Sequence, residues 1–198
     1  MNIVFDLGGV VLTWKPDEII ATVFDDPETQ AVVLAGVFGH ADWLELDRGT
    51  LDRDQAILRA AARTGLPESR IFELMMQVPK GLRPVPETVD LVYRLKENGH
   101  RLFCLSNMHV ASMARLERVY DFWDVFEGLV ISCRLHLVKP EPEIYAYLLR
   151  QYDLTAEETV FIDDTQVNVD AAARLGIRPI RFENADRCAG CLRAMGCL

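Results

Sequence analysis

The spacing of apolar and polar residues divides the chain into two parts. A short apolar run at residues 2–5 reads as a buried strand, and the next stretch of about seventy residues shows helical periodicity instead of strand alternation. From Pro86 onward, helical segments alternate with short apolar segments. The helices expected in the first part are 18–24, 28–38, 53–63 and 68–76, with further pieces bringing the total to four or five.

Local start and stop signals support these helices. Asp17, Asp26 and Asp52 stand where a helix would begin, and an aspartate there can accept a hydrogen bond from the free amides of the first turn. Pro67 also fits a helix start, because its fixed backbone suits the first turn. Gly65 is expected to end the third helix.

The second part predicts a parallel sheet. Strands that alternate with helices form such a sheet, and the helices cover both of its faces. The first strand is expected to join it, so that the helical stretch 15–84 becomes a cap inserted into a core of residues 1–14 and 85–198. The expected strands of this part are 101–105, 128–132, 159–162 and 177–182, and the expected helices are 87–98, 111–119, 142–152 and 167–175.

Composition limits the protein's class and its partners. The chain has 198 residues, 50% of them hydrophobic, and no apolar run approaches the roughly 18 residues that span a bilayer. Asp6 interrupts the N-terminus before a secretory signal could develop, so we expect a cytoplasmic protein. The net charge of -9 disfavours nucleic acid and anionic membranes but attracts divalent cations. We expect a monomer or weak homodimer that binds a small molecule.

The five cysteines do not suggest a disulfide framework. Their number is odd, and Cys104 and Cys133 fall within or beside apolar segments. Cys188, Cys191 and Cys197 could hold zinc with a histidine from elsewhere, but no histidine follows position 136. A helical tail with free thiols is the preferred interpretation.

Polar residues gather where three predicted strands end. Asp6 follows the first strand, Ser106 and Asn107 follow the second, and Asp163 and Asp164 follow the strand at 159–162. Ligands of open parallel sheets bind beyond the carboxyl ends of the strands. Each residue alone could simply cap a turn or a helix, and that ordinary role is the better interpretation for any one of them.

The group as a whole predicts a phosphate site with magnesium. Lys139 precedes a proline and therefore lies on a loop near the same edge. Three carboxylates beside one lysine would repel one another unless something binds there. A divalent cation on the carboxylates and an anion on the lysine, the hydroxyl and backbone amides would balance these charges.

The glycines after Asp6 fit this interpretation. A turn without side chains lets backbone amides face an anion and lets a carbonyl approach a metal. Asp6 would then reach the phosphorus as a nucleophile. The sequence has no GxxxxGK[ST] pattern, so this is not a P-loop.

Four motifs in order resemble those of the haloacid dehalogenase superfamily, and the resemblance covers nearly the whole chain. They are "FDLGGVV" at the start, "LSN" at 105–107, Lys139 in "VKPEP", and "FIDDTQVN" at 161–168. The resemblance implies a Rossmann-like parallel sheet core with an inserted small helical cap that includes "WLELDRGTL". Within the superfamily, the segments "DLGGV" and "VKPEPEIY" are most similar to those of bacterial sugar-phosphate phosphatases, including those acting on glucose 1-phosphate.

The resemblance also implies residue roles. Asp6 would attack phosphorus and form an aspartyl-phosphate, and Asn168 would support the metal site from the next helix. By the same resemblance, the catalytic residues are Asp6, Ser106 and Lys139; the phosphate-binding residues are Leu7, Gly8, Ser106, Asn107 and Lys139; and the Mg²⁺ ligands are Asp6, the Gly8 carbonyl, Asp164 and Asp163, the last as a ligand or an orienting residue.

One position departs from the family pattern. Most phosphatases of this superfamily carry a second aspartate two residues after the nucleophile, where it protonates the leaving group. Here that residue is Gly8. Either the leaving group departs with little help, as an anomeric oxygen would, or a cap residue such as His40 or Asp47 supplies the proton, or turnover is slow.

Other functions remain open at this point. A 2-haloacid dehalogenase also lacks the second aspartate but has no use for the metal pair, and a phosphomutase should retain the missing acid. A non-catalytic phosphate-binding protein is a further alternative. In the cap, Trp43 and Phe38 are expected to be packing residues, whereas Asp47 and Arg48 could serve either packing or substrate binding.

Overall fold

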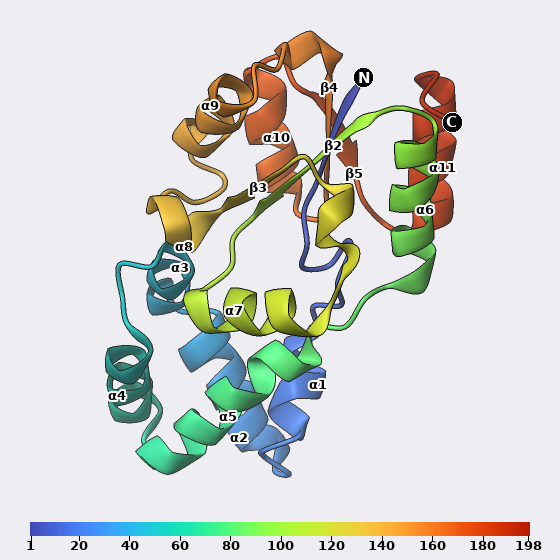
Figure 1. The fold of residues 1–198 in the computed structure, drawn as a ribbon. Helices are drawn as coiled ribbons and strands as arrows, with labels where there is room; N and C mark the ends of the chain where they lie inside the picture. The colour runs from blue at the N-terminus through green and yellow to red at the C-terminus, as the bar shows by residue number, and fades with distance from the viewer.

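The chain's central feature is a five-stranded parallel sheet with helices on both faces (Figure 1). The computed structural model describes residues 1–198. The strand order is β3-β2-β1-β4-β5, and every neighbouring pair is parallel. The predicted α/β fold and its five strands are therefore confirmed. The strands are β1 (Asn2–Phe5), β2 (Arg101–Ser106), β3 (Gly128–Ile131), β4 (Thr159–Asp163) and β5 (Arg178–Arg181).

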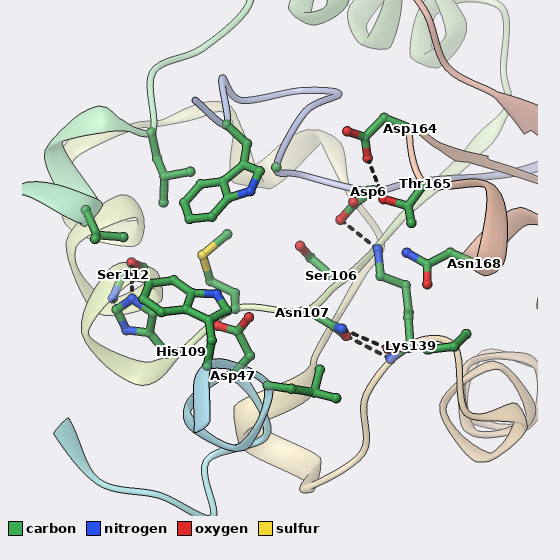
Figure 2. A pocket seen from close by; sticks show the side chains of 18 of the residues that line it. Asp6, Asp47, Ser106, Asn107, His109, Ser112, Lys139, Asp164, Thr165 and Asn168 are labelled. Atoms are coloured by element: carbon green, nitrogen blue, oxygen red, sulfur yellow. Dashed lines mark hydrogen bonds and ion pairs between the residues drawn. The ribbon is translucent and has the colours of Figure 1, made fainter. Parts of the chain in front are cut away.

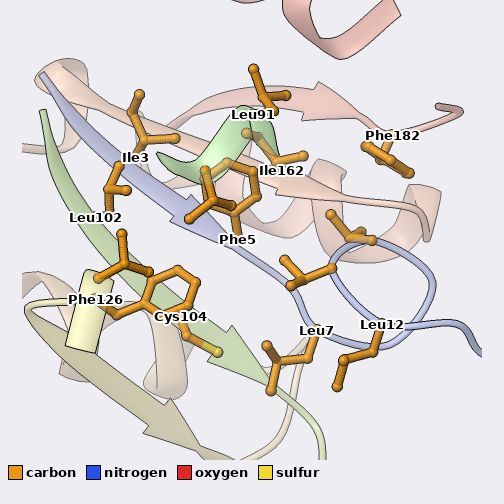
Figure 3. Close-up of a cluster of buried hydrophobic side chains, with 14 of the residues drawn as sticks. Ile3, Phe5, Leu7, Leu12, Leu91, Leu102, Cys104, Phe126, Ile162 and Phe182 are labelled. Carbon is orange, nitrogen blue, oxygen red and sulfur yellow. The ribbon is translucent and has the colours of Figure 1, made fainter. Parts of the chain in front are cut away.

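Each face of the sheet has its own hydrophobic cluster. Ile3 and Phe5 of β1 pack with α6 (Pro86–Glu97) and α11 (Ala185–Ala194), as Figure 3 shows in part. Val4 points to the opposite face, toward α9 (Pro142–Gln151) and α10 (Gln166–Arg174). Burial on both faces explains why residues 3–5 of the first strand are all apolar instead of alternating with polar residues.

Residues between β1 and α6 form a separate group of helices, seen in the lower part of Figure 1. They enclose a hydrophobic cluster of 16 buried residues that all lie between Ile19 and Val78. This second core supports the predicted cap at 15–84, and we propose that it acts as one. Its elements are α1 (Pro16–Ala21), α2 (Pro27–Val33), the π-helical turn η1 (Leu34–Phe38), α3 (Ala41–Arg48), α4 (Arg53–Thr64) and α5 (Glu68–Gly81).

The predicted helix starts were correct at two of the three aspartates. The side chains of Asp26 and Asp52 accept hydrogen bonds from backbone amides three residues on. Asp17 instead lies within the first turn of α1, because Pro16 occupies the first helical position. Ser132 was expected to end the strand 128–132, but in the structure it begins the short helix α8 (Ser132–Leu135).

The remaining elements complete the connections around the sheet. Helix α7 (Val110–Val119) follows β2 at the edge that faces the helical group. Short helical turns are η2 (Phe122–Val125) and η3 (Ala156–Glu158). None of the helices is both long and apolar enough to cross a membrane.

Candidate active site

A cavity of about 360 Å³ lies between the carboxyl ends of the strands and the proposed cap (Figure 2). Seven residues predicted from sequence for the phosphate and metal site line it together, although they come from four separate segments. These are Asp6, Gly8, Ser106, Asn107, Lys139, Asp164 and Asn168. Two other predicted residues, Leu7 and Asp163, are completely buried beside it.

The ammonium group of Lys139 joins two of the carboxylates. Its Nζ lies 2.8 Å from Oδ1 of Asp6 and 2.6 Å from Oδ2 of Asp163. Lysine burial alone would lower the pKa of Lys139, but these two negative charges outweigh burial and raise it. Lys139 is therefore a fixed, fully charged group at the base of the cavity.

Asp163 is held from several directions. Besides Lys139, it accepts hydrogen bonds from the Thr165 amide at 2.8 Å and from the Asn168 side chain at 3.1 Å to each oxygen. These partners occupy both carboxylate oxygens. The sequence resemblance implies that Asp163 either binds the metal or orients the site. The geometry favours the orienting role.

Asn107 positions the lysine segment. Its amide nitrogen donates to the Lys139 carbonyl at 3.0 Å, and its amide oxygen accepts from the Lys139 backbone N–H at 2.8 Å. This reciprocal pair fastens the loop before α9 to the end of β2. The Asn107 side chain, predicted from sequence to bind phosphate, is thus committed to the backbone of Lys139.

The carboxylates at the sheet edge fit a divalent cation. Oxygens of Asp6, Asp163 and Asp164 lie within 4.8 Å of one another, and of these Asp163 is held by its own hydrogen-bond partners, which leaves Asp6 and Asp164 as the candidate direct ligands. Burial raises the pKa of Asp6 to about 7, against the lowering effect of Lys139, and burial with the nearby Asp163 also raises the pKa of Asp164. One lysine is thus too little positive charge for the cluster, and hard oxygen donors are what Mg²⁺ prefers.

The two glycines after Asp6 differ in what they require. Gly9 has φ of +80°, and a Cβ there would lie 2.2 Å from Oδ2 of Asp164, so only glycine fits. A Cβ at Gly8 would contact only Trp14, at 3.7 Å. Neither the backbone nor the neighbours therefore demand glycine at position 8.

The wall contributed by the proposed cap is different in character. Trp43, Leu44 and Asp47 of α3 line it, and Asp47 is buried with only 9% of its surface exposed. Burial raises the pKa of Asp47 to about 7, opposed by the neighbouring His109 amide and Trp43 indole and reinforced by the charge of Asp6. This wall thus contains a carboxyl group that is readily protonated near neutral pH.

The other cap residues considered from sequence lie elsewhere. The ring of His40 accepts a hydrogen bond from the Asp42 amide at the start of α3 and does not line the cavity. Phe38 packs against Trp14 and Trp43. Arg48 forms a two-bond ion pair with Glu141, with both distances 2.8 Å, and so ties α3 to the loop before α9. Trp43, expected to be a packing residue, both packs and lines the cavity.

Several lining residues were not anticipated from sequence. Trp14, Val78, Leu82, Met108 and Val167 add apolar surface, and His109 and Thr165 add polar atoms. His109 could have been noticed as a helix-capping residue two positions after Asn107, and it does cap α7. The apolar residues carry no such signal, because their exposure to a cavity depends on how the helices pack.

The chain belongs to the haloacid dehalogenase-like hydrolase family. The model of that family matches residues 1–176, which include all four motifs. The chain is therefore an enzyme of the hydrolase class, and phosphatases among its relatives support the phosphoric monoester hydrolase type predicted from sequence.

Two curated relatives match over nearly their full lengths. The sesquiterpene phosphatase astK of Aspergillus oryzae is 29% identical over 98% of this chain and 96% of its own length. The D-ribitol-5-phosphate phosphatase of Bacteroides thetaiotaomicron is 25% identical over 92% of each protein. The predicted similarity to bacterial sugar-phosphate phosphatases is consistent with the second of these.

Solved structures share the fold. A HAD family enzyme from Bacteroides thetaiotaomicron, in a mutant form complexed with magnesium and inorganic phosphate, has a TM-score of 0.73 at 21% identity, covering 92% of this chain and 93% of that one. The L-2-haloacid dehalogenase of Xanthobacter autotrophicus has a TM-score of 0.69 at 19% identity, covering 98% and 82%. Both likenesses concern the fold alone.

Proposed function

We propose that the chain is a magnesium-dependent phosphatase that hydrolyses a small phosphorylated metabolite through an aspartyl-phosphate on Asp6. The observation that carries this proposal is the position of Asp6 at the base of the cavity, 2.8 Å from the Lys139 ammonium and next to Asp164. A nucleophile, a fixed cation and a carboxylate cluster at one point are what phosphoryl transfer requires.

In this proposal the chain's own groups bind and orient the phosphoryl group. The Leu7 amide, which donates to Oδ1 of Asp6 at 2.7 Å, and Lys139 hold the nucleophile in one orientation. Lys139, Ser106 and the backbone amide of Gly8 would bind the phosphoryl oxygens, whereas the Leu7 amide, predicted from sequence for the same role, is engaged with Asp6. Asn107 and Asp163 act indirectly, because both are bonded to Lys139.

Asp6, Asp164 and the Gly8 carbonyl are the proposed Mg²⁺ ligands, with Asp163 orienting the site. When bound, the cation would neutralise charge on the phosphoryl group and favour the ionised form of Asp6. The carboxylate oxygens of Asp6, Asp163 and Asp164, which lie within 4.8 Å of one another, support a cation at this point.

Two substrate classes have support. A sugar phosphate is the prediction from sequence, and the relative that acts on D-ribitol 5-phosphate is consistent with it. The apolar walls formed by Trp14, Trp43, Val78 and Leu82 favour a phosphate ester of an apolar alcohol. The name of the sesquiterpene phosphatase supports this second class.

The decisive experiment measures phosphate release from para-nitrophenyl phosphate with magnesium, with EDTA, and in Asp6→Asn. We expect activity only in the magnesium-loaded wild type, because Asp6→Asn keeps the side-chain shape but removes the nucleophile. Asp17→Asn, an exposed aspartate of α1, is the matched control and should retain activity. Activity that persists in EDTA or in Asp6→Asn would overturn the proposal.

The same preparation tests the alternatives. Halide release from a 2-haloacid without phosphatase activity would identify a dehalogenase, and phosphate binding without turnover would identify a binding protein. A panel of sugar phosphates and isoprenoid or aryl phosphates then distinguishes the two substrate classes.

A further inference from the structure

Hydrolysis of an unactivated phosphate ester requires a proton at the leaving oxygen, and the family position for that acid is Gly8. In an in-line displacement the leaving oxygen departs on the side of phosphorus opposite the nucleophile. Asp6 lies at the sheet edge, so the leaving oxygen would face the wall formed by the proposed cap. A replacement acid should therefore be sought on that wall.

We propose that Asp47, supplied by helix α3, is the general acid of this enzyme and takes the place of the aspartate missing at position 8. This inference rests on the phosphatase function proposed above. Asp47 lines the same cavity as Asp6 and lies across it in Figure 2. Its burial raises its pKa to about 7, so a substantial fraction carries a proton at neutral pH.

The other protonatable side chains near the leaving group are already engaged. His109 lines the cavity, but burial lowers its pKa to about 4, and its two ring nitrogens contact the backbone amide and hydroxyl of Ser112. It is therefore neutral and occupied as a helix cap. His40 is outside the cavity and caps α3 through its ring.

The fold holds Asp47 in place through its backbone. Its carbonyl accepts a hydrogen bond from the Ser132 hydroxyl at 2.5 Å, and that hydroxyl accepts one from the Met108 amide at 2.9 Å. Two residues later Gly49, with φ of +80°, lets the end of α3 approach α8, because a Cβ there would lie 2.8 Å from the Cys133 carbonyl. The backbone that carries the Asp47 carboxyl group is thus anchored to the segment after β3, although it belongs to the proposed cap.

The proposed step balances as follows. As Asp6 forms its bond to phosphorus and the bond from phosphorus to the ester oxygen breaks, the Asp47 carboxyl donates its proton to the departing oxygen, releasing a neutral alcohol. The Asp47 carboxylate then takes a proton from the water that attacks the aspartyl-phosphate. Inorganic phosphate leaves, Asp6 regains its carboxylate, and Asp47 is protonated again.

The test compares kcat/KM of wild type and Asp47→Asn over phosphate esters of increasing leaving-group basicity, from para-nitrophenyl to alkyl phosphates. We expect Asp47→Asn to lose about 10²- to 10⁴-fold on alkyl phosphates and little on para-nitrophenyl phosphate, whose leaving group needs no proton. Glu45→Gln, a half-exposed carboxylate of the same helix that does not line the cavity, is the matched control and should match the wild type.

Two further measurements separate catalysis from structure. The wild-type rate on an alkyl phosphate should fall as the pH rises through about 7, because the acid form is then lost, and this limb should disappear in Asp47→Asn. The groups that face Asp47 and set this titration are Asp6, Lys139, His109 and Cys133. Adding Gly8→Asp to Asp47→Asn should restore alkyl phosphate hydrolysis, since position 8 has room for a side chain.

An equal loss on all esters, or no loss on any, would overturn the role of Asp47 while leaving the phosphatase function intact. Absence of phosphate release by wild type from every ester would instead overturn the proposed function itself. If Asp47→Asn does not fold, the wild-type slope decides: a steep fall in rate with leaving-group basicity would exclude an enzymatic acid.

Discussion

The two walls of the cavity differ in how their polar groups are held. At the sheet edge Lys139 pairs directly with both Asp6 and Asp163, and Asn107 fixes the lysine backbone. On the cap wall most of the surface is apolar, and Asp47 is the carboxylate that lines it. From this difference we propose that the sheet edge provides the reaction centre, whereas the wall formed by the proposed cap selects the leaving group and protonates it.

The largest effect in this comparison is expected from Lys139→Met, which removes the central charge of the sheet edge but keeps the length of the side chain. Loss of this fixed electrostatic donor should reduce kcat/KM by about 10²- to 10³-fold. It should also cost about 3–5 kcal/mol of unfolding free energy, because Asp6 and Asp163 would remain buried without their partner.

Steady-state kinetics and urea unfolding measure the two effects of Lys139→Met. Lys15→Met removes an exposed lysine whose side chain is 59% accessible, and should change neither quantity measurably. Added Mg²⁺ should recover part of the lost stability, since it supplies positive charge to the same carboxylates. An unchanged kcat/KM would exclude Lys139 from the reaction centre.

The same contrast explains what the sequence could predict. Parallel strands place their carboxyl ends at one edge whatever the cap does, so Asp6, Ser106 and Asp164 could be grouped from strand order alone. By contrast, whether a residue of α3 lines the cavity depends on how that helix packs against the rest of the chain. Adjacent residues there have different positions: Asp47 lines the cavity, whereas Arg48 pairs with Glu141 outside it.

Secondary structure shows a similar limit. The central strands were predictable because burial on both faces makes their middle residues continuously apolar, as in residues 3–5 and 102–105. Helix α8 was not, because its four residues continue the pattern of β3 and its conformation is set by contacts with α3. Gly8 and Gly9 could be recognised as a turn, but the left-handed backbone of Gly9 and its contact with Asp164, which distinguish the required glycine from the other, are visible only in the structure.

A smaller effect should separate the two glycines. Gly9→Ala places a β-carbon against Asp164 and forces a left-handed backbone on alanine, so we expect a loss of about 1–2 kcal/mol and weaker Mg²⁺ binding. Gly8→Ala should leave both nearly unchanged, because its β-carbon would meet only Trp14 at 3.7 Å. Urea unfolding and calorimetric Mg²⁺ titration provide the comparison. Equal effects at the two positions would show that the Asp164 contact does not govern this turn.

The smallest effect concerns the ion pair that joins the two walls. Arg48 and Glu141 make two hydrogen bonds of 2.8 Å, with side-chain exposures of 18% and 39%. Solvent screening at this exposure limits the pair to about 1 kcal/mol despite its favourable geometry. We therefore expect Arg48→Gln to lower stability by no more than about 1 kcal/mol, with a double-mutant cycle through Glu141→Gln assigning most of that loss to the pair.

Because the Arg48–Glu141 pair joins α3 to the loop that carries Lys139, its loss should affect substrates that fill the cavity more than those that do not. KM for a bulky apolar phosphate should rise in Arg48→Gln, while kcat for para-nitrophenyl phosphate should stay near the wild-type value. Arg134→Gln is the matched control. It breaks a 2.6 Å surface pair with Glu117 that does not involve the helices of the proposed cap, and it should leave both constants unchanged. The difference in KM between wild type and Arg48→Gln should shrink in 1 M salt, where the screening length falls to about 3 Å. A coupling energy of zero between Arg48 and Glu141, or equal effects of Arg48→Gln on both substrates, would contradict this prediction. Either result would show that apolar packing alone holds the two walls together and that the ion pair does not set their separation.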